Sequence, residues 1–192
     1  MRETCRQARA WYDARFPPIR VGINISAVEL LDRKFVAGVR SVLLETGVDP
    51  TCVELELTET SLLRDSKSTA AVLHALKDLG VGLALDDFGT GYSSLSHLKR
   101  FPIDALKIDQ SFVRDIVTDA DDASIVSAVI SMGKSLQMRV VAEGVETREQ
   151  LTFLRQQNCP EGQGYFFSRP VAPIEFTQLL AHRVGGAQLL EG

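Results

Sequence analysis

Oxygen-bearing side chains stand at the ends of several short aliphatic runs in this 192-residue sequence. Asp86 and Asp87 follow the run Gly-Leu-Ala-Leu and precede a loop that holds two glycines and two serines. Adjacent carboxylates repel each other and are costly to desolvate. One or two hard divalent cations, which prefer oxygen ligands as Mg²⁺ does, would neutralise them. The oxygen donors that form this candidate metal set are Asn24, Glu56, Asp86, Asp87 and Asp109.

Lys107 lies among these acids, where it can offset charge or hold a water molecule. Each residue also has a structural explanation: a turn at Asn24, a solvated face at Glu56, an ion pair between Lys107 and Asp109, or a helix cap at Asp86 and Asp87. Because every acid falls at the same end of successive predicted strands, the joint pattern favours a site. The three histidines lack metal-ligand spacing, and the sequence has no nucleophile elbow, P-loop or dinucleotide-binding glycine motif.

Strand-like and helix-like segments alternate along the chain. The predicted strands are 20–26, 52–58, 80–87, 105–109, 139–143 and 164–167. The predicted helices are 2–15, 28–47, 65–80, 119–138, 147–158 and 173–184. This alternation implies a parallel sheet with right-handed crossovers.

The first four strands each have an aliphatic face and a small or polar face. In the second strand, for example, Val53, Leu55 and Leu57 oppose Glu54, Glu56 and Thr58. An open sheet covered on both sides by helices needs apolar residues on both faces. A barrel explains the asymmetry better, because its aliphatic residues face the outer helices and its polar groups gather inside. We therefore expect an α/β fold, an incomplete TIM-type (β/α)₈ barrel of about six strand–helix units.

Composition excludes some classes of partner. The net charge of −4 gives no reason to expect a nucleic acid polymer or an anionic membrane surface. No apolar stretch approaches the roughly 20 residues that a membrane helix needs. The three cysteines, Cys5, Cys52 and Cys159, form no Cys-x-x-Cys pair. A reduced, cytoplasmic setting is therefore the expectation.

Five stretches resemble the EAL-domain family, the cyclic di-GMP phosphodiesterases. They are NIS (24–26), ELTET (56–60), LDDFGTGYSSLSHLKRFPIDALKIDQSFV (85–113), VVAEGVET (140–147) and QGYFFSRP (163–170). The resemblance implies a modified (β/α)₈ barrel, and we expect this domain to span 1–184. The residues GGAQLLEG at the end of the chain indicate a flexible tail, 185–192. It also implies hydrolysis of cyclic di-GMP to linear pGpG in bacterial second-messenger signalling.

The resemblance further assigns roles to individual residues. The candidate metal set named above would hold two ions, Mg²⁺ or Mn²⁺. Lys107 and Glu143 would orient or activate the attacking water. Glu59 would anchor the loop after Asp87, with Ser93 as its partner, and Gln163 would be a further contact in the active site.

One departure from the family pattern affects the expected activity of this chain. The Glu-Ala-Leu signature, whose glutamate is a metal ligand in the family, is absent, as is the Gln-Pro segment before it. We expect the chain to begin at the helix before the third barrel strand, with open sheet edges at 20–26 and 164–167. Such edges favour self-association or a homodimer, and the missing ligand predicts impaired activity.

Two other functions remain open, and one further expectation concerns the parent protein. The first alternative is a catalytically silent cyclic di-GMP receptor or regulatory module. The second is an unrelated Mg²⁺-dependent barrel enzyme, such as an enolase-like enzyme. A parent protein of this family would also carry sensory or diguanylate-cyclase-like (GGDEF-type) domains.

Overall fold

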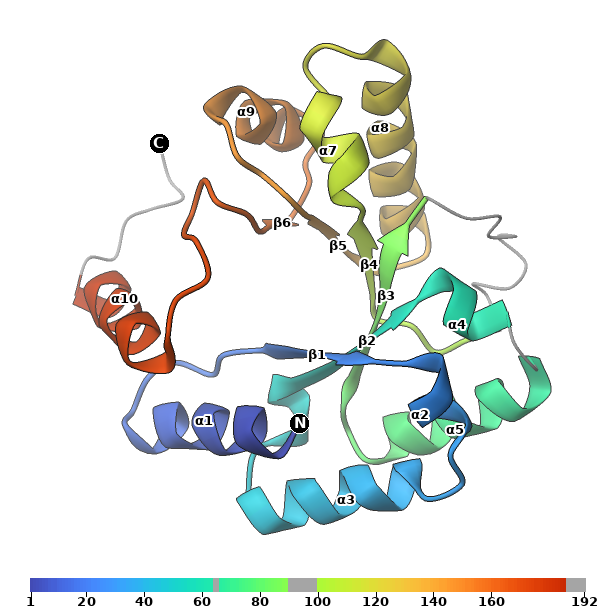
Figure 1. The fold of residues 1–192 in the computed structure, drawn as a ribbon. Helices are drawn as coiled ribbons and strands as arrows, with labels where there is room; N and C mark the ends of the chain where they lie inside the picture. Colours follow the sequence, from blue (N-terminus) through green and yellow to red (C-terminus); the bar gives the residue numbers. More distant parts are fainter. Residues whose placement is uncertain (64–65, 90–99, 186–192) are drawn as a thin grey trace.

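The computed structural model describes residues 1–63, 66–89 and 100–185. Six strands in these residues form one parallel sheet in sequential order (Figure 1). They are β1 (Val21–Ile25), β2 (Val53–Thr58), β3 (Gly82–Phe88), β4 (Ala105–Ile108), β5 (Arg139–Ala142) and β6 (Glu161–Gly162). Sequential parallel order is the strand arrangement of a (β/α) barrel, so the expected α/β fold class is confirmed.

Helices connect the strands and lie outside the sheet (Figure 1). They are α1 (Arg2–Asp13), α2 (Ala27–Leu31), α3 (Phe35–Thr46), α4 (Glu59–Leu63), α5 (Ser66–Asp78), α7 (Gln110–Asp115), α8 (Ala120–Ser135), α9 (Arg148–Gln156) and α10 (Pro173–Gly185), with a 3₁₀ turn, η1, at Pro50–Cys52. None of the helices in the described residues combines the length and apolarity needed to cross a bilayer. The expected tail lies outside the described residues from residue 186 onward.

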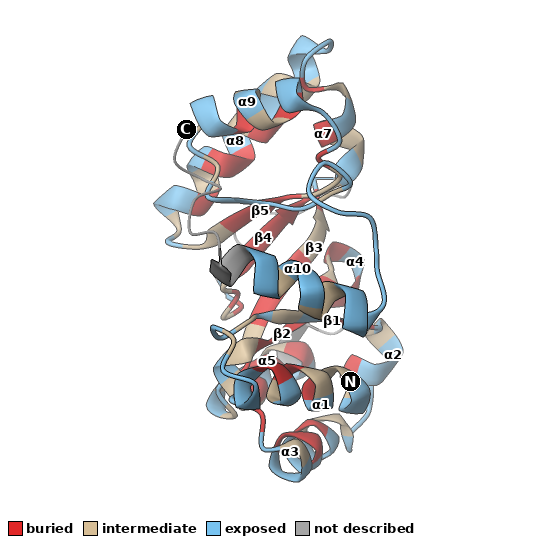
Figure 2. Cartoon of the chain, turned by 90° about the vertical axis from the view of Figure 1, so that its left-hand side faces the viewer, coloured by how far each residue is buried: buried red, intermediate tan, exposed pale blue. Residues whose placement is uncertain are grey.

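The aliphatic face of the sheet packs against the helices, as its residue pattern predicts. Leu55, Leu57, Leu83 and Leu85 are fully buried. Figure 2 shows buried residues along the strands and on the helix faces turned toward them, with exposed residues on the outside. The opposite face of the sheet therefore carries the small and polar side chains inward.

Two predicted elements differ from the structure. The expected single helix 28–47 is two helices, because the Asp32 side chain accepts a hydrogen bond from the Lys34 backbone at 2.9 Å and forms a turn. The predicted strand 164–167 is wrong. The last strand is Glu161–Gly162, and 164–167 forms a turn. Gly164 packs so closely on the backbone of Val145 that a side chain there would collide with it.

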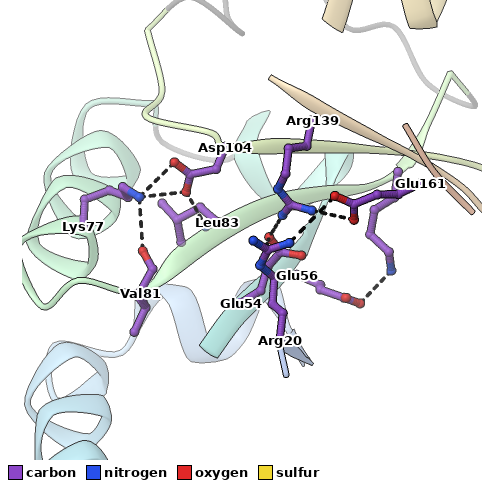
Figure 3. A network of polar contacts seen from close by, with 10 residues as sticks. Arg20, Glu54, Glu56, Lys77, Val81, Leu83, Asp104, Arg139 and Glu161 are labelled. Carbon is purple, nitrogen blue, oxygen red and sulfur yellow. Dashed lines mark hydrogen bonds and ion pairs between the residues drawn. The ribbon is translucent and has the colours of Figure 1, made fainter. Parts of the chain in front are cut away.

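An ion network joins the N-terminal ends of four strands. Figure 3 shows Arg139 between Glu54 and Glu161, and its guanidinium pairs with both carboxylates. Arg20, just before β1, lies 4.0 Å from Glu54 and 3.9 Å from Glu161. Burial raises the pKa of Glu54 although both arginines act to lower it. The network therefore supplies the positive charge that a buried carboxylate at this end of the barrel requires.

A second contact fixes the start of β3 and β4. The Lys77 ammonium donates to both oxygens of Asp104, at 2.9 and 2.8 Å, and to the Val81 carbonyl at 3.2 Å (Figure 3). Asp104 also accepts from the Leu83 backbone at 2.8 Å. Helix α5 is thereby tied to both strands at the end opposite the carboxyl ends of the strands.

Helix α10 returns to pack on α1, next to the edge strand β1 (Figure 1). The Trp11 ring lies 5.1 Å from the Phe176 ring, measured between centroids. Its indole N–H donates to Thr177 Oγ1 at 2.8 Å. Trp11 is 9% exposed, so this one side chain joins the first and last described helices.

Replacing Trp11 with alanine should destabilise the chain by about 3 kcal/mol, the typical loss for a buried tryptophan. It should also raise hydrogen exchange in α10, because the contact with Phe176 and Thr177 is lost. Urea unfolding followed by circular dichroism and peptide-resolved exchange measure the two effects. Tyr12→Ala is the matched control, since Tyr12 is 55% exposed. Equal effects of the two variants would contradict the proposed docking of α10.

Candidate active site

Lys107 on β4 lies at the centre of a cluster of carboxylates. Its ammonium nitrogen is 2.7 Å from Glu56 Oε2, 3.0 Å from Asp86 Oδ1 and 2.8 Å from Glu143 Oε1. These partners come from β2, β3 and the residue after β5. Lys107 is 5% exposed. The parallel sheet therefore brings one buried cation and three anions together near the carboxyl ends of its strands.

The charges in this cluster shift the pKa values of its members. Burial alone would lower the pKa of Lys107, but hydrogen bonds and charges from Glu143, Glu56 and Asp86 outweigh it and raise the pKa. Burial raises the pKa of Glu143 to about 7, against the lowering effect of Lys107 and with the added repulsion of Asp86. Lys107 therefore stays charged, whereas Glu143 has a pKa suited to proton exchange near neutral pH.

Asp86 and Asp87 both reach the cluster although neighbouring side chains on a regular strand point to opposite faces. The backbone of Asp87 has a φ of 53°. The pairing of β3 with β4 shifts register between Leu85 and Phe88. This irregularity, inside β3, turns the second carboxylate inward. Carboxylate oxygens of Asp86, Asp87 and Glu143 then all lie within 4.8 Å of one another.

Asp109 joins the cluster through Asp87. Their carboxyl groups share a hydrogen bond, and burial, the Asp86 charge and this bond raise the pKa of Asp87. Burial would also raise the pKa of Asp109, but hydrogen bonds from Ser111 and Asp87 lower it. Asp109 is also the N-cap of α7 and accepts from the Ser111 backbone at 2.8 Å. Lys107 pairs with Glu56, Asp86 and Glu143 in the described residues, and Asp109 has this capping role instead.

The donor set fits a divalent metal ion. Asp86 Oδ1 is buried, and the Lys107 ammonium 3.0 Å from it is shared with Glu56 and Glu143. One ammonium does not balance the charge of several buried carboxylates, and a divalent cation would neutralise the remainder. The three carboxylates within 4.8 Å of one another supply the hard oxygen ligands that Mg²⁺ and Mn²⁺ take.

The remaining predicted site residues lie at different distances from this cluster. The Gln163 amide donates to Glu143 Oε1 at 2.5 Å, which places it at the site. Asn24 is exposed on β1, opposite Glu56 in the strand register. Glu59 begins α4 and is 4% exposed, with neither carboxylate oxygen hydrogen-bonded in the described part of the chain. Ser93 lies outside the described residues.

Sequence reasoning did not single out Gly22, although it touches the site. Glu56 Oε1 occupies the space that a side chain at position 22 would take. The only signal in the sequence is a glycine two residues before Asn24. Its meaning depends on the parallel register of β1 and β2, which the sequence alone does not provide.

Comparison with known proteins identifies relatives of this chain. The family described as "EAL domain" matches residues 1–170. The bifunctional diguanylate cyclase/cyclic di-GMP phosphodiesterase MucR of Pseudomonas aeruginosa is 43% identical over 179 residues, which cover 93% of this chain and 26% of MucR. The cyclic di-GMP phosphodiesterase NbdA of the same organism is 45% identical over 188 residues, or 97% of this chain and 24% of NbdA.

Solved structures of cyclic di-GMP complexes have a fold similar to that of this chain. The MucR phosphodiesterase in complex with c-di-GMP has a TM-score of 0.88 and 40% identity, and the match covers 91% of this chain and 71% of that one. The manganese/cy-diGMP complex of Klebsiella pneumoniae BlrP1 has a TM-score of 0.81 and 34% identity, covering 90% and 43%.

The chain spans about a quarter of the length of the curated relatives it matches. The family match covers most of the chain, and both of these relatives are more than 40% identical to it over the aligned residues. The resemblance found in the sequence is thereby confirmed, and the chain belongs to the EAL domain family.

Proposed function

We propose that this chain carries the catalytic carboxylates of a phosphodiesterase that hydrolyses cyclic di-GMP to linear pGpG in bacterial second-messenger signalling. The observation that carries the proposal is the buried Lys107, surrounded by Glu56, Asp86 and Glu143, with Asp87 in the same group of carboxylates. Relatives named as cyclic di-GMP phosphodiesterases support the substrate. We further propose that the functional domain spans 1–184.

Divalent metal ions, Mg²⁺ or Mn²⁺, are the proposed cofactors. The BlrP1 complex with manganese and cyclic di-GMP supports this choice. The residues proposed to hold the ions are Asn24, Glu56, Asp86, Asp87 and Asp109. Two bound ions would supply a nucleophilic water at neutral pH and neutralise charge on the phosphate.

The residues around Lys107 then act on the attacking water. Glu143 accepts its proton while the water oxygen bonds to phosphorus. The phosphorus–oxygen bond to the ribose breaks, and the proton passes to the leaving ribose oxygen, so that one water is consumed for each linear dinucleotide. Lys107 and the Gln163 amide both donate to Glu143 Oε1, at 2.8 and 2.5 Å, and hold that carboxylate in place. Glu59 and Ser93 are proposed to anchor the loop that follows Asp87.

The setting of the domain is also a proposal. The MucR relative is bifunctional and carries a diguanylate cyclase activity, so further GGDEF-type or sensory domains in a longer protein suit this chain. The unpaired cysteines Cys5, Cys52 and Cys159 suit a reducing, cytoplasmic compartment. Cyclic di-GMP is the proposed ligand.

A receptor that binds cyclic di-GMP without cleaving it is the second candidate. The observation that favours it is the similarity to the MucR phosphodiesterase structure solved in complex with c-di-GMP, which supports binding of the ligand apart from its cleavage. Scoring binding and turnover separately, with cyclic di-GMP and Mn²⁺, distinguishes the two functions. Turnover supports the phosphodiesterase, and binding without turnover supports the receptor.

Glu143→Gln should lower kcat by about 10²-fold or more while KM changes little, because a group that takes a proton acts in the transition state. Steady-state production of pGpG with saturating Mn²⁺ measures both constants. Glu146→Gln is the matched control, since Glu146 is exposed and its backbone N–H donates to Gln150 Oε1, outside the cluster. An unchanged kcat in Glu143→Gln removes Glu143 from the mechanism.

The chain should self-associate through β1, which pairs only with β2 in the described sheet. A version extended at its N-terminus by a family segment that carries Glu-Ala-Leu should associate less and cleave faster. Light scattering after size exclusion, together with turnover assays of both versions, tests this. If the chain alone is a monomer that turns over as fast as the extended version, the expected impairment is wrong.

A further inference from the structure

Gly22 leaves a space inside the sheet that Glu56 fills. A side chain at position 22 would overlap Glu56 Oε1 and the carbon that carries it. In the strand register Glu56 lies opposite Asn24, two residues beyond Gly22. Glu56 Oε1 therefore lies over Gly22, toward the N-terminal end of β1, whereas Glu56 Oε2 faces the Lys107 ammonium.

Lys107 holds the second oxygen of Glu56 and so fixes the orientation of the carboxylate. Glu56 Oε2 accepts from the Lys107 ammonium at 2.7 Å. Among the described residues, the acids close enough to share one ion are Asp86, Asp87 and Glu143, and Glu56 is outside that group. Two features thus keep Glu56 aside: the ion pair with Lys107 and the empty space above Gly22.

We propose that Gly22 is a positioning residue that sets the metal affinity of the site by letting Glu56 turn away from the other carboxylates. Metal binding then requires Glu56 to leave Lys107 and the space at Gly22. A β-carbon at position 22 removes the resting position and favours the orientation toward the metal. The inference rests on the proposed metal centre, and it concerns a residue that no ligand set includes.

Gly82 lacks the close approach of a carboxylate that is present at Gly22. Both glycines lie opposite Glu54 in the strand register, one on each neighbouring strand. A β-carbon at Gly82 would meet Glu54 Oε2 at 3.4 Å, an ordinary contact. Alanine at position 82 therefore displaces no carboxylate of the cluster, whereas alanine at position 22 must displace Glu56.

The test is a titration of the 192-residue chain with Mn²⁺, in which electron paramagnetic resonance reports the free ion. Gly22→Ala should bind Mn²⁺ about fivefold more tightly, the gain expected if the competent orientation is populated about one-fifth of the time in the unaltered chain. Gly22→Ser, which adds the same β-carbon, should also bind more tightly. Gly82→Ala should leave the affinity unchanged.

Glu56→Gln separates this effect from a general gain in strand stability. It should weaken Mn²⁺ binding, and adding Gly22→Ala to it should restore nothing. A gain of the same size in the Glu56→Gln background overturns the inference, as does an unchanged or weaker affinity in both Gly22 variants. If the unaltered chain binds Mn²⁺ and only the gain is missing, the metal centre stands and this inference alone fails. Absence of binding in every variant contradicts both.

Discussion

The site depends on keeping one ammonium group charged inside the barrel. A buried cation is tolerated only when anions pair with it closely, and Lys107 meets this need with Glu56, Asp86 and Glu143. Each partner comes from a different part of the sheet, so the ion cluster fixes the relative position of four strands. The same arrangement leaves more negative than positive charge at the carboxyl ends. That surplus is what a divalent cation would neutralise.

Two glutamates on the inner face of β2 have different roles because different cations pair with them. Glu54 and Glu56 are two residues apart and share a face. Glu54 pairs with Arg139 and lies near Arg20, so arginines that have no part in the cluster neutralise it. Glu56 instead shares Lys107 with two other carboxylates. Of these two glutamates, only Glu56 is therefore available as a metal ligand. The charged residues around each glutamate account for this difference.

The faces of the strands and the acidic residues at the strand ends could be predicted from the sequence. Both follow from the alternation of aliphatic and polar residues along each strand. Burial of Leu55, Leu57, Leu83 and Leu85 against the helices confirms this. The inward turn of Asp87 could not be predicted, since it depends on an irregularity between β3 and β4. The aromatic run at 165–167 suggests a strand, but the close approach of Gly164 to Val145 makes a turn. Both of these differences arise from contacts between segments distant in the sequence, whereas the break of the predicted helix 28–47 comes from the local turn at Asp32.

The most direct test of the account is anomalous diffraction at the manganese edge from crystals of the chain grown with Mn²⁺ and cyclic di-GMP. The account predicts anomalous peaks in contact with Asp86 and Asp87, with Glu56 turned toward them and away from Gly22. Crystals that show no manganese at these carboxylates, with cyclic di-GMP bound and Lys107 still paired to Glu56, Asp86 and Glu143, would contradict it.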